Sequence, residues 1–212
     1  MKPHLIILGA PGSGKGTQAA RLVLKGFRHV STGDLLRSEI DKGSVLGQRV
    51  ASIISKGDLV DDATVLDLLK ANCEVDRFSY IFDGFPRNLA QAKMLDEQLL
   101  QAKKNLAVYF KVDSAALVSR IVNRRTCRTC GEIYNLLTKA PRESNVCDKC
   151  GARDTLLKRK DDTEEVVSNR MKIFTDEVEP MLAFYKSKDS LIEIDASMQE
   201  NEIFAILERV IN

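Results

Sequence analysis

A glycine-rich loop near the start of the chain holds the first residues suited to chemistry. Residues 9–17 read Gly-Ala-Pro-Gly-Ser-Gly-Lys-Gly-Thr and directly follow the apolar run Leu5–Leu8. Glycines let a backbone curl so that successive N–H groups converge on phosphate oxygens, and the helix that follows adds the positive end of its dipole. Lys15 can reach the β- and γ-phosphates of a nucleoside triphosphate, with Thr17 near the metal ion, although Gly16 separates the two. We therefore expect a phosphate-binding loop here, in preference to a turn that binds nothing.

A second motif runs from Tyr80 to Arg87 and reads Tyr-Ile-Phe-Asp-Gly-Phe-Pro-Arg. Asp83 would end a buried strand, which is where phosphate-loop enzymes hold Mg²⁺ or its water shell. The rigid Gly84-Phe85-Pro86 turn would then aim Arg87 into the same cleft. The simpler alternative is an ordinary strand-to-helix turn with Arg87 in solvent. Beside a phosphate loop, the functional interpretation is favoured.

Four of the five cysteines form two Cys-x-x-Cys pairs, Cys127 with Cys130 and Cys147 with Cys150, sixteen residues apart. This spacing is typical of a tetrahedral zinc site made of four thiolates, and a glycine follows each pair as a tight chelating turn requires. The alternative is two reduced pairs without a metal. Cys73 is left over on a helical stretch and is expected to be a buried apolar side chain, not a nucleophile.

The elements that must position these residues alternate between strand and helix patterns. Five strands are expected, at Leu5–Leu8, Arg28–Val30, Tyr80–Phe82, Leu106–Val112 and Leu191–Ile194. Helical spacing occurs at Thr17–Leu24, Thr64–Asn72, Leu89–Gln101, Ala115–Arg124 and Glu164–Phe184. This alternation predicts an α/β fold whose parallel sheet is covered by helices on both faces. Ligands of such sheets bind beyond the carboxyl ends of the strands, where the phosphate loop, Asp83 and Asp195 fall.

One segment, Cys127–Lys160, breaks this pattern. It is rich in turn formers, cysteines and charged residues, and we interpret it as an inserted subdomain. Its far boundary is predicted to be a helix start, because Asp162-Thr163-Glu164-Glu165 offers a capping residue with a carboxylate three positions on.

The composition excludes several classes of protein. With 212 residues, of which 44% are hydrophobic, one α/β domain with an insertion is expected. The net charge of +2 arises from 32 basic and 30 acidic side chains, which argues against a general nucleic-acid binder. No apolar stretch is long enough to span a bilayer, and the chain enters a core strand too early for a signal peptide. A cytoplasmic protein with reduced thiols is expected.

Taken together, these motifs resemble the adenylate kinases of the bacterial type. The matching segments are Gly9–Thr17, Ser31–Asp34, Lys56–Val60, Asp83–Arg87 with Gln91, Arg120–Arg125, and Arg159–Asp162 followed by Arg170. The resemblance implies the phosphate-loop nucleoside monophosphate kinase fold, with a parallel five-stranded sheet flanked by helices. It divides the chain into a core (1–30, 61–122 and 163–212), an AMP-binding insertion (31–60) and a zinc-binding lid (123–162). It also implies a monomeric enzyme that uses Mg²⁺ to transfer a phosphoryl group reversibly from ATP to AMP, giving two ADP, in adenine nucleotide homeostasis.

The resemblance also assigns site residues. Those implied for AMP are Thr32, Arg37, Asp58, Leu59, Val60, Gly84, Phe85, Pro86, Arg87, Gln91, Arg159 and Arg170. Those implied for ATP are Gly12, Ser13, Gly14, Lys15, Gly16, Thr17, Arg120, Arg124, Ile133, Tyr134 and a backbone carbonyl near Met198. Lys15, Arg87, Arg124, Arg159 and Arg170 are implied to be catalytic, Asp83 to hold Mg²⁺ through water, and the four paired cysteines to hold a structural Zn²⁺.

The arginines make physical sense for such a reaction. Arg120 and Arg124 are four residues apart, which on a helix places them on one face, and the simple alternative is a solvated basic stripe. Here they lie at one hinge of the insertion, and Arg159 and Arg170 flank the other. Two phosphate-bearing substrates bring roughly six negative charges into one cleft, which one Mg²⁺ and Lys15 cannot balance. Converging guanidinium groups would balance them.

The histidines are not needed for the chemistry. The acceptor phosphate of AMP has a second pKa of about 6 and is already a nucleophilic dianion at neutral pH. His4 and His29 precede core strands and are expected to be structural or exposed. Catalysis is then expected to consist of positioning and charge stabilisation in a site kept dry by the lid.

Three other functions compete with this interpretation. A nucleoside monophosphate kinase with another acceptor base would share most of the motifs. A zinc-ribbon NTPase that binds nucleic acid is disfavoured by the balanced charge and the aromatic content of 6%. A phosphate loop that only hydrolyses ATP as a switch would have no use for the second arginine set, Arg37 and Arg87.

Overall fold

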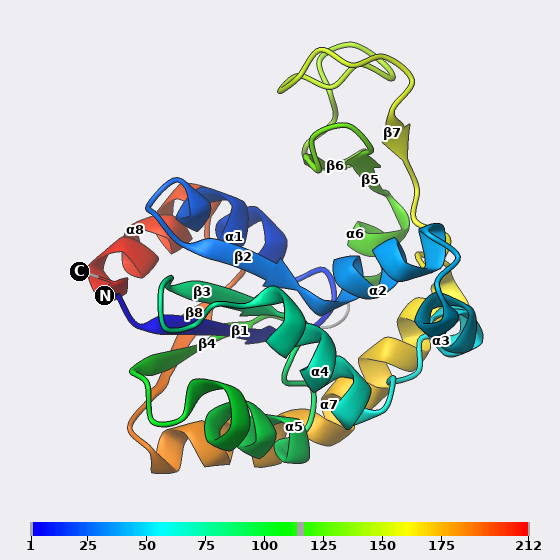
Figure 1. Cartoon of the computed structure of the whole chain (residues 1–212). Coiled ribbons are helices and arrows are strands. Elements are labelled where there is room, and N and C mark those ends of the chain that lie inside the picture. The colour runs from blue at the N-terminus through cyan, green and yellow to red at the C-terminus, as the bar shows by residue number, and fades with distance from the viewer. Residues whose placement is uncertain (1, 114–116, 212) are drawn as a thin grey trace.

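A five-stranded parallel sheet forms the centre of the molecule (Figure 1). The computed structural model describes residues 2–113 and 117–211. Its central strands are β1 (His4–Gly9), β2 (Arg28–Ser31), β3 (Tyr80–Asp83), β4 (Asn105–Lys111) and β8 (Leu191–Asp195). They lie in the order β2-β3-β1-β4-β8, and every neighbouring pair is parallel. The predicted parallel five-stranded sheet is therefore confirmed.

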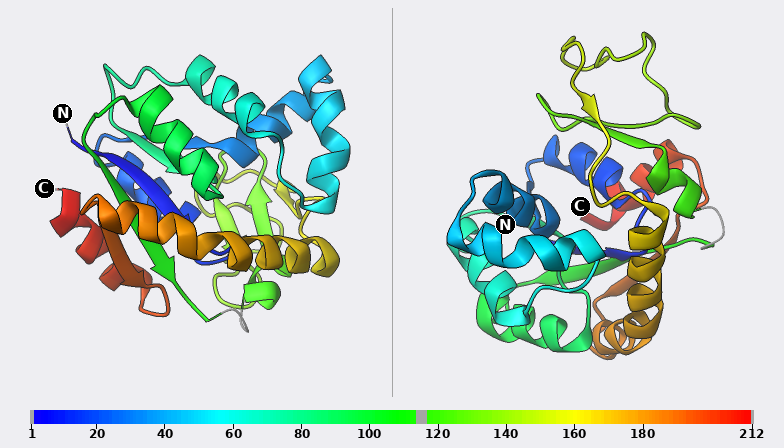
Figure 2. Two further views of the ribbon diagram at one scale, coloured as in Figure 1. Left: turned by 90° about the horizontal axis from the view of Figure 1, so that it is seen from below. Right: turned by 90° about the vertical axis from the view of Figure 1, so that its right-hand side faces the viewer.

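Helices cover both faces of this sheet, as the strand–helix alternation predicted (Figures 1 and 2). On one face lie α1 (Lys15–Val23) and α8 (Glu200–Ile211). On the other lie α4 (Asp62–Asn72), α5 (Leu89–Met94), the π-helical η1 (Leu95–Leu100) and the long α7 (Glu164–Ser187). Strand β1 shows why two layers form: Leu5 and Ile7 pack in the core under α1 and α8, whereas Ile6 and Leu8 pack in the core under α4, α5 and α7. Since successive side chains of a strand point to opposite faces, one continuous apolar run supplies both cores.

A helical pair extends from the carboxyl end of β2. It consists of α2 (Thr32–Asp41) and α3 (Val45–Lys56). Serine hydroxyls cap both helices, since Ser31 accepts from the N–H of Asp34 and Ser44 accepts from the N–H of Gly47. Beside the far end of α3 runs the first half of α7 (Figure 1).

The inserted segment forms a separate small sheet. After α6 (Leu117–Val122), the strands β5 (Arg124–Cys127), β6 (Ile133–Asn135) and β7 (Leu156–Leu157) pair antiparallel in the order β6-β5-β7. We call residues 123–162 the lid. It rises from the main body on the side where the strands of the central sheet end (Figures 1 and 2).

Two of the predicted helices differ clearly from the structure. The helix expected over Ala115–Arg124 is α6, which ends at Val122, and Ala115 lies outside the described residues. Arg124 begins β5, where it pairs with Asn135, so Arg120 and Arg124 do not share a helix face. The helix expected over Leu89–Gln101 is divided into α5 and η1.

The far boundary of the insertion also differs by one residue. The N-cap of α7 is Thr163, whose hydroxyl accepts from the N–H of Val166. Asp162 instead directs its carboxylate at Arg124. Helix α8 was not among the predicted elements. Among the described residues, no helix is both long and apolar enough to cross a membrane.

Candidate active site

The glycine-rich loop connects β1 to α1 in a conformation that leaves backbone N–H groups for an anion. Gly12 and Gly14 adopt positive φ values of 82° and 93°, which favour glycine. Gly14 is the N-cap of α1 and provides no side-chain cap, so the first turn of the helix keeps donors for a phosphate. The ammonium group of Lys15 donates to the carbonyl oxygens of Gly9 (2.7 Å) and Ala10 (2.8 Å) and so lies inside the loop. Burial lowers the pKa of Lys15 to about 8, and the charges of Asp83, Arg87 and Arg124 act on it from around the loop.

The lid reaches this loop through Ile133. A Cβ atom on Gly16 would lie 3.2 Å from the Cδ1 atom of Ile133, and one on Gly12 would lie 2.9 Å from Cγ1 of Ile121 in α6. The predicted ATP residue Ile133 is thus beside the phosphate loop. The side chain of Tyr134 is buried among the lid cysteines, so a contact of this residue with ATP would come from its backbone.

Asp83 ends β3 beside the loop, as predicted. Its Oδ2 atom lies 3.2 Å from Nε2 of His29, which β2 places opposite β3. Burial alone would raise the pKa of Asp83, but the hydrogen bond from His29 and the charge of Lys15 hold it below its usual value. Asp83 is therefore an ionised carboxylate beside the loop, and it can accept hydrogen bonds from the water molecules that surround Mg²⁺. The contact with His29 was not predicted.

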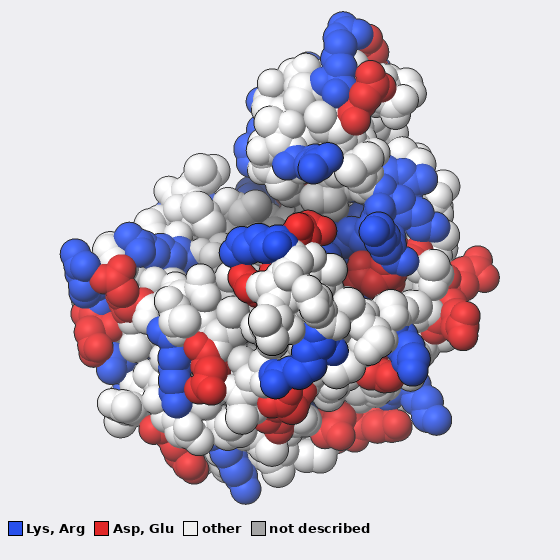
Figure 3. Space-filling model, turned by 45° about the vertical axis from the view of Figure 1, so that its right-hand side comes forward, with Lys and Arg blue, Asp and Glu red and all other residues white. Residues whose placement is uncertain are grey.

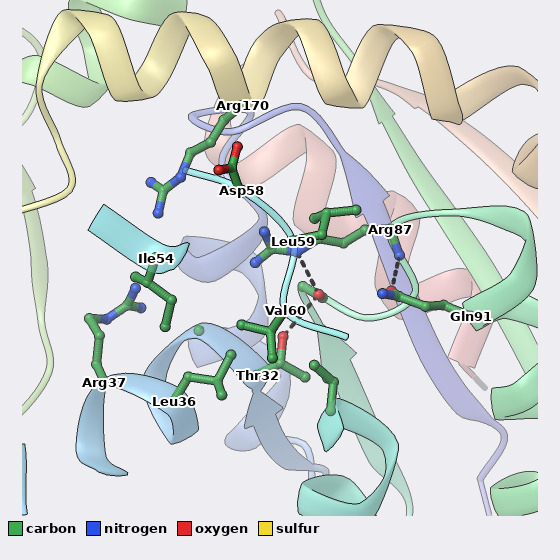
Figure 4. A pocket seen from close by; sticks show the side chains of 13 residues that line it. Thr32, Leu36, Arg37, Ile54, Asp58, Leu59, Val60, Arg87, Gln91 and Arg170 are labelled. Carbon is green, nitrogen blue, oxygen red and sulfur yellow. Dashed lines mark hydrogen bonds between the residues drawn. The ribbon is translucent and has the colours of Figure 1, made fainter. Parts of the chain in front are cut away.

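A pocket lies beyond the carboxyl ends of β2 and β3, between α2, α3 and α7 (Figure 4). Its lining residues are Thr32, Gly33, Leu36, Arg37, Ile54, Asp58, Leu59, Val60, Val65, Gly84, Arg87, Gln91 and Arg170. Three arginines thus face a pocket whose other walls are largely apolar. Such a combination can hold a phosphate at one end and a flat ring at the other. Most of the residues expected to hold AMP line this pocket. Three of them do not: Phe85 and Pro86 are buried in the turn after β3, and Arg159 lies outside the lining.

Close packing shapes the floor of this pocket. Arg87 donates from Nε to the carbonyl oxygen of Gly84 (2.8 Å), and the hydroxyl of Thr32 donates to the same oxygen (2.9 Å). Gly84 has a φ of 81°, and a Cβ atom there would lie 2.8 Å from the hydroxyl oxygen of Thr32. The turn after β3 therefore requires glycine and fixes the side chain of Arg87 at the pocket.

Aspartates join the arginines of the pocket to those of the lid hinges. Asp34 accepts from Arg37 (2.5 Å) and from Arg159 (3.3 Å). The hollow between lid and body accordingly shows basic and acidic side chains side by side (Figure 3). The cleft is therefore lined by charges of both signs, and these acidic partners were not predicted as site residues.

The far hinge holds the other two acidic partners. Asp162, with its side chain fully buried, accepts from Nε (2.9 Å) and Nη2 (2.5 Å) of Arg124. Asp161 binds Arg170 closely and lies 3.4 Å from Arg37. Arg120 and Met198 complete the predicted ATP residues: Arg120 lies in α6, and Met198 is exposed in the turn after β8.

The four paired cysteines converge within the lid. Their sulfur atoms all lie within 4.8 Å of one another. The Sγ atoms of Cys127 and Cys150 are 3.7 Å apart, and those of Cys130 and Cys147 are 3.6 Å apart. Thiolates bound tetrahedrally to zinc at ~2.3 Å would be separated by about 3.8 Å, so this donor set fits the ion. Cys73, the C-cap of α4, was expected to be buried but is only partly buried, packed against the core of the body. Burial raises the pKa of its thiol to about 12, as suits a side chain that is not a nucleophile.

Comparisons with known proteins agree with this arrangement. A family model described as adenylate kinase matches residues 7–190. A protein of Archaeoglobus fulgidus named adenylate kinase is 41% identical, and the match covers 98% of this chain and 99% of that protein. Proteins with the same name from Thermosipho melanesiensis and Paracoccus denitrificans are 41% and 39% identical, over 99% and 100% of this chain and 98% of each relative.

Proposed function

The chain belongs to the adenylate kinase family, and on this basis we propose that it transfers a phosphoryl group reversibly from Mg²⁺-bound ATP to AMP, giving two ADP. The observation that supports this most directly is the pair of adjoining phosphate sites. One is the glycine-rich loop with Lys15, and the other is the arginine-lined pocket beyond β2 and β3. An ATP-hydrolysing switch has no use for the second site.

The proposed assignment of substrates to the two sites follows the resemblance to the adenylate kinase family. ATP places its phosphates on residues 12–17, with its base toward Ile133, Arg120 and the turn at Met198. AMP occupies the pocket between Thr32 and Arg170. The corresponding division of the chain is a core, an AMP-binding insertion over residues 31–60 and a lid over residues 123–162.

The proposed chemistry needs no general base. The AMP phosphate is a dianion near neutral pH, so the protein has only to align it with the γ-phosphate of ATP and stabilise the charge that spreads between them. Arg87 approaches from the pocket, and Arg124 and Arg159 approach from the two hinges of the lid. Without substrate, the guanidinium groups of Arg124 and Arg159 donate to Asp162 and Asp34. When the phosphates bind, their oxygens replace these carboxylates as the hydrogen-bond acceptors. Closing the lid would exclude water, which strengthens these interactions.

Two metal ions belong to the proposal. Mg²⁺ arrives with ATP, neutralises phosphate charge, and would be held through water by Asp83. Zn²⁺ would be held by Cys127, Cys130, Cys147 and Cys150. Because four thiolates fill a tetrahedral shell, this ion has no open position for substrate, and we propose that it is structural.

The remaining assignments concern the setting of the enzyme. We propose a monomer, because both substrate sites are complete within one chain. A role in adenine nucleotide homeostasis follows from the reaction, and a cytoplasmic location follows from the supply of its substrates and the reduced cysteines. No contact with nucleic acid or with a membrane is required.

A coupled assay with AMP, GMP, CMP and UMP as acceptors tests the proposed reaction. AMP is expected to be preferred by more than tenfold, and two adenosines joined through five phosphates should compete with both substrates. Preference for another monophosphate would indicate the related kinase with a different acceptor base. Turnover without an acceptor together with salt-dependent binding of an oligonucleotide would favour the zinc-ribbon NTPase.

A further inference from the structure

The side-chain amide of Gln91 is held from two sides at the edge of the arginine-lined pocket. Asn88 caps α5 by accepting from the backbone N–H of Gln91 (2.7 Å), and the side chain of Gln91 extends back toward the preceding loop. Its Oε1 atom accepts from the backbone N–H of Arg87 (2.7 Å; Figure 4). Its Nε2 atom donates to Oδ1 of Asp62 (2.8 Å), the first residue of α4. Only 2% of Gln91 is exposed.

These two partners permit one orientation of the amide. A backbone N–H can only donate, and an ionised carboxylate can only accept. Rotating the amide by 180° would set its NH₂ group against the N–H of Arg87 and its carbonyl oxygen against the carboxylate of Asp62. Both hydrogen bonds would be lost and both contacts would be repulsive. The bound orientation leaves one lone pair on Oε1 and one N–H on Nε2 for a ligand.

Among the side chains that line this pocket, Gln91 is the best suited to form specific hydrogen bonds with a base. The three arginines of the lining suit a phosphate, and the hydroxyl of Thr32 already donates to Gly84. Asp58 accepts from Asn169 (2.8 Å). The neutral amide of Gln91 retains one donor and one acceptor, which match a purine edge that offers one of each.

The fixed orientation matters because adenine and hypoxanthine have edges of the same size on which the hydrogen-bond donor and acceptor exchange places. The 6-amino group of adenine donates and its N1 accepts, whereas the 6-oxo group of hypoxanthine accepts and its N1–H donates. A freely rotating glutamine would suit either base. An amide that cannot rotate suits one of them and leaves unpaired polar groups against the other, which binding sites penalise strongly.

We propose that Asp62 is a specificity-determining residue of the acceptor site, which fixes the Gln91 amide in the orientation that pairs with a 6-amino purine and rejects a 6-oxo purine. The inference rests on the proposed function, since it takes the pocket to hold AMP. Asp62 is a positioning residue: it acts through Gln91 and is absent from the pocket lining.

The test compares AMP with IMP as acceptors, because the two bases differ in their hydrogen-bonding edge and hardly in size. In the wild-type protein kcat/KM should favour AMP strongly. In Asp62→Ala the ratio of the two kcat/KM values should fall by about tenfold or more, the typical effect of a hydrogen bond to a charged group. In Asp62→Asn it should fall by about threefold, because an asparagine amide can present either its oxygen or its NH₂ group to Gln91. The matched control is Asp67→Ala, which removes an exposed aspartate from the same helix and should leave the ratio unchanged.

Each outcome decides one question. Equal losses with AMP and IMP in Asp62→Ala would mean that Asp62 only supports the fold, and the proposal would be overturned. Wild-type protein that uses IMP as well as AMP would overturn it too. Wild-type protein that does not use AMP at all would instead overturn the proposed function. Should Asp62→Ala not fold, since Asp62 lies in the first turn of α4, an unchanged ratio in Asp62→Asn would overturn the proposal.

Discussion

Carboxylates hold the arginines of the cleft in place before any phosphate is bound. Asp162 forms two hydrogen bonds with Arg124, and Asp34 lies between Arg37 and Arg159. An arginine that is already oriented loses less side-chain entropy when a phosphate binds, and its planar fork suits phosphate oxygens as well as carboxylate oxygens. We therefore propose that these ion pairs position the arginines for the reaction.

Replacing any one of Arg87, Arg124 and Arg159 by alanine is expected to lower kcat by about 10³-fold or more, the effect of removing an arginine that stabilises a moving phosphoryl group. Steady-state kinetics with saturating ATP and AMP measure this. Arg128→Ala, on the exposed zinc knuckle, is the control and should change kcat little. Near-normal kcat in Arg159→Ala would show that the far hinge does not reach the phosphates.

At the scale of the residue, the sequence predicted those parts of the site whose partners are neighbours in the chain. The phosphate loop and the cysteine pairs are local motifs, and local spacing determines their chemistry. The contacts between His29 and Asp83 and between Asp62 and Gln91 join residues 54 and 29 positions apart. No short motif records such a pair, because the fold alone brings the two side chains together.

The helical pair α2 and α3 is packed so closely that it depends on one glycine. A Cβ atom on Gly47 would lie 2.1 Å from the carbonyl oxygen of Glu39. Gly47→Ala gains about 1 kcal/mol of helix propensity, but the two helices must separate, and such overpacking costs about 1–3 kcal/mol or more. We expect a net loss in the free energy of unfolding, measured by denaturant titration. Ser52→Ala, on the exposed side of α3, should be neutral or slightly stabilising; a stable Gly47→Ala would show that the helices adjust without cost.

His4 makes the junction of β1 and β3 sensitive to acid. Its Nδ1 atom accepts from the backbone N–H of Tyr80 (3.2 Å), and only 1% of the residue is exposed. Burial, followed by the charge of Lys103, lowers the pKa of His4, so below about pH 6.5 the unfolded chain binds a proton that the folded chain resists. The contribution of His4 to stability is therefore fully present above that pH and is lost as the pH falls below it.

The melting temperature is accordingly expected to fall by about 2 °C or more between pH 7.5 and pH 5.5 through this residue alone. His4→Asn supplies the comparison, because its carbonyl oxygen can accept from Tyr80 and does not titrate. The drop should be smaller in His4→Asn than in the wild-type protein. Equal drops in both proteins would assign the acid sensitivity to other groups.

At the scale of the element, apolar runs predicted the five strands because a strand buried on both faces needs a continuous apolar sequence. Boundaries were less predictable where tertiary contacts decide them. Arg124 continues a helical pattern after Ile121, yet it begins β5 because its backbone pairs with Asn135 across the lid sheet. Aspartate is a favoured N-cap residue, but the carboxylate of Asp162 accepts hydrogen bonds from Arg124. The N-cap of α7 is therefore the next residue, Thr163.

The lid and the body of the molecule are stabilised by different means. The body has two apolar clusters that enclose the central sheet from both faces. The buried cluster of the lid consists of Cys127, Tyr134 and Cys147, with Cys130 and Leu156 packed against it. The hydroxyl of Tyr134 lies 3.4 Å from Sγ of Cys147 and accepts from the N–H of Asp148 (2.7 Å). A cluster of this size offsets little of the conformational entropy lost in ordering a segment of about 40 residues, which supports the proposed structural metal in the lid.

The sequence indicated an inserted segment at Cys127–Lys160, because the cysteine spacing and the break in strand–helix alternation are both visible in it, and this segment contains the separate small sheet. It did not show that Tyr134 belongs to the cysteine cluster, since nothing in a sequence tells which face of a short strand is inward. Nor did it show how closely the lid approaches the loop: Ile133, on the same strand as Tyr134, lies beside Gly16. One strand thus connects the cysteine cluster to the glycine-rich loop.

Removing the metal from the lid, by a chelator or by changing Cys147 and Cys150 together to serine, is expected to lower the melting temperature while substantial activity remains in the cold. A structural zinc ion can contribute on the order of 10 kcal/mol to the segment that it folds, and the Zn(Cys)₄ unit carries about two negative charges that phosphates would avoid. Differential scanning calorimetry together with the coupled assay at low temperature measures both effects. Cys73→Ala removes a thiol outside the cluster and should leave the bound zinc and the lid unchanged. If the metal-free protein kept its melting temperature but lost all turnover, the zinc would belong to the chemistry, and β6 would be the path by which it acts on the phosphate loop.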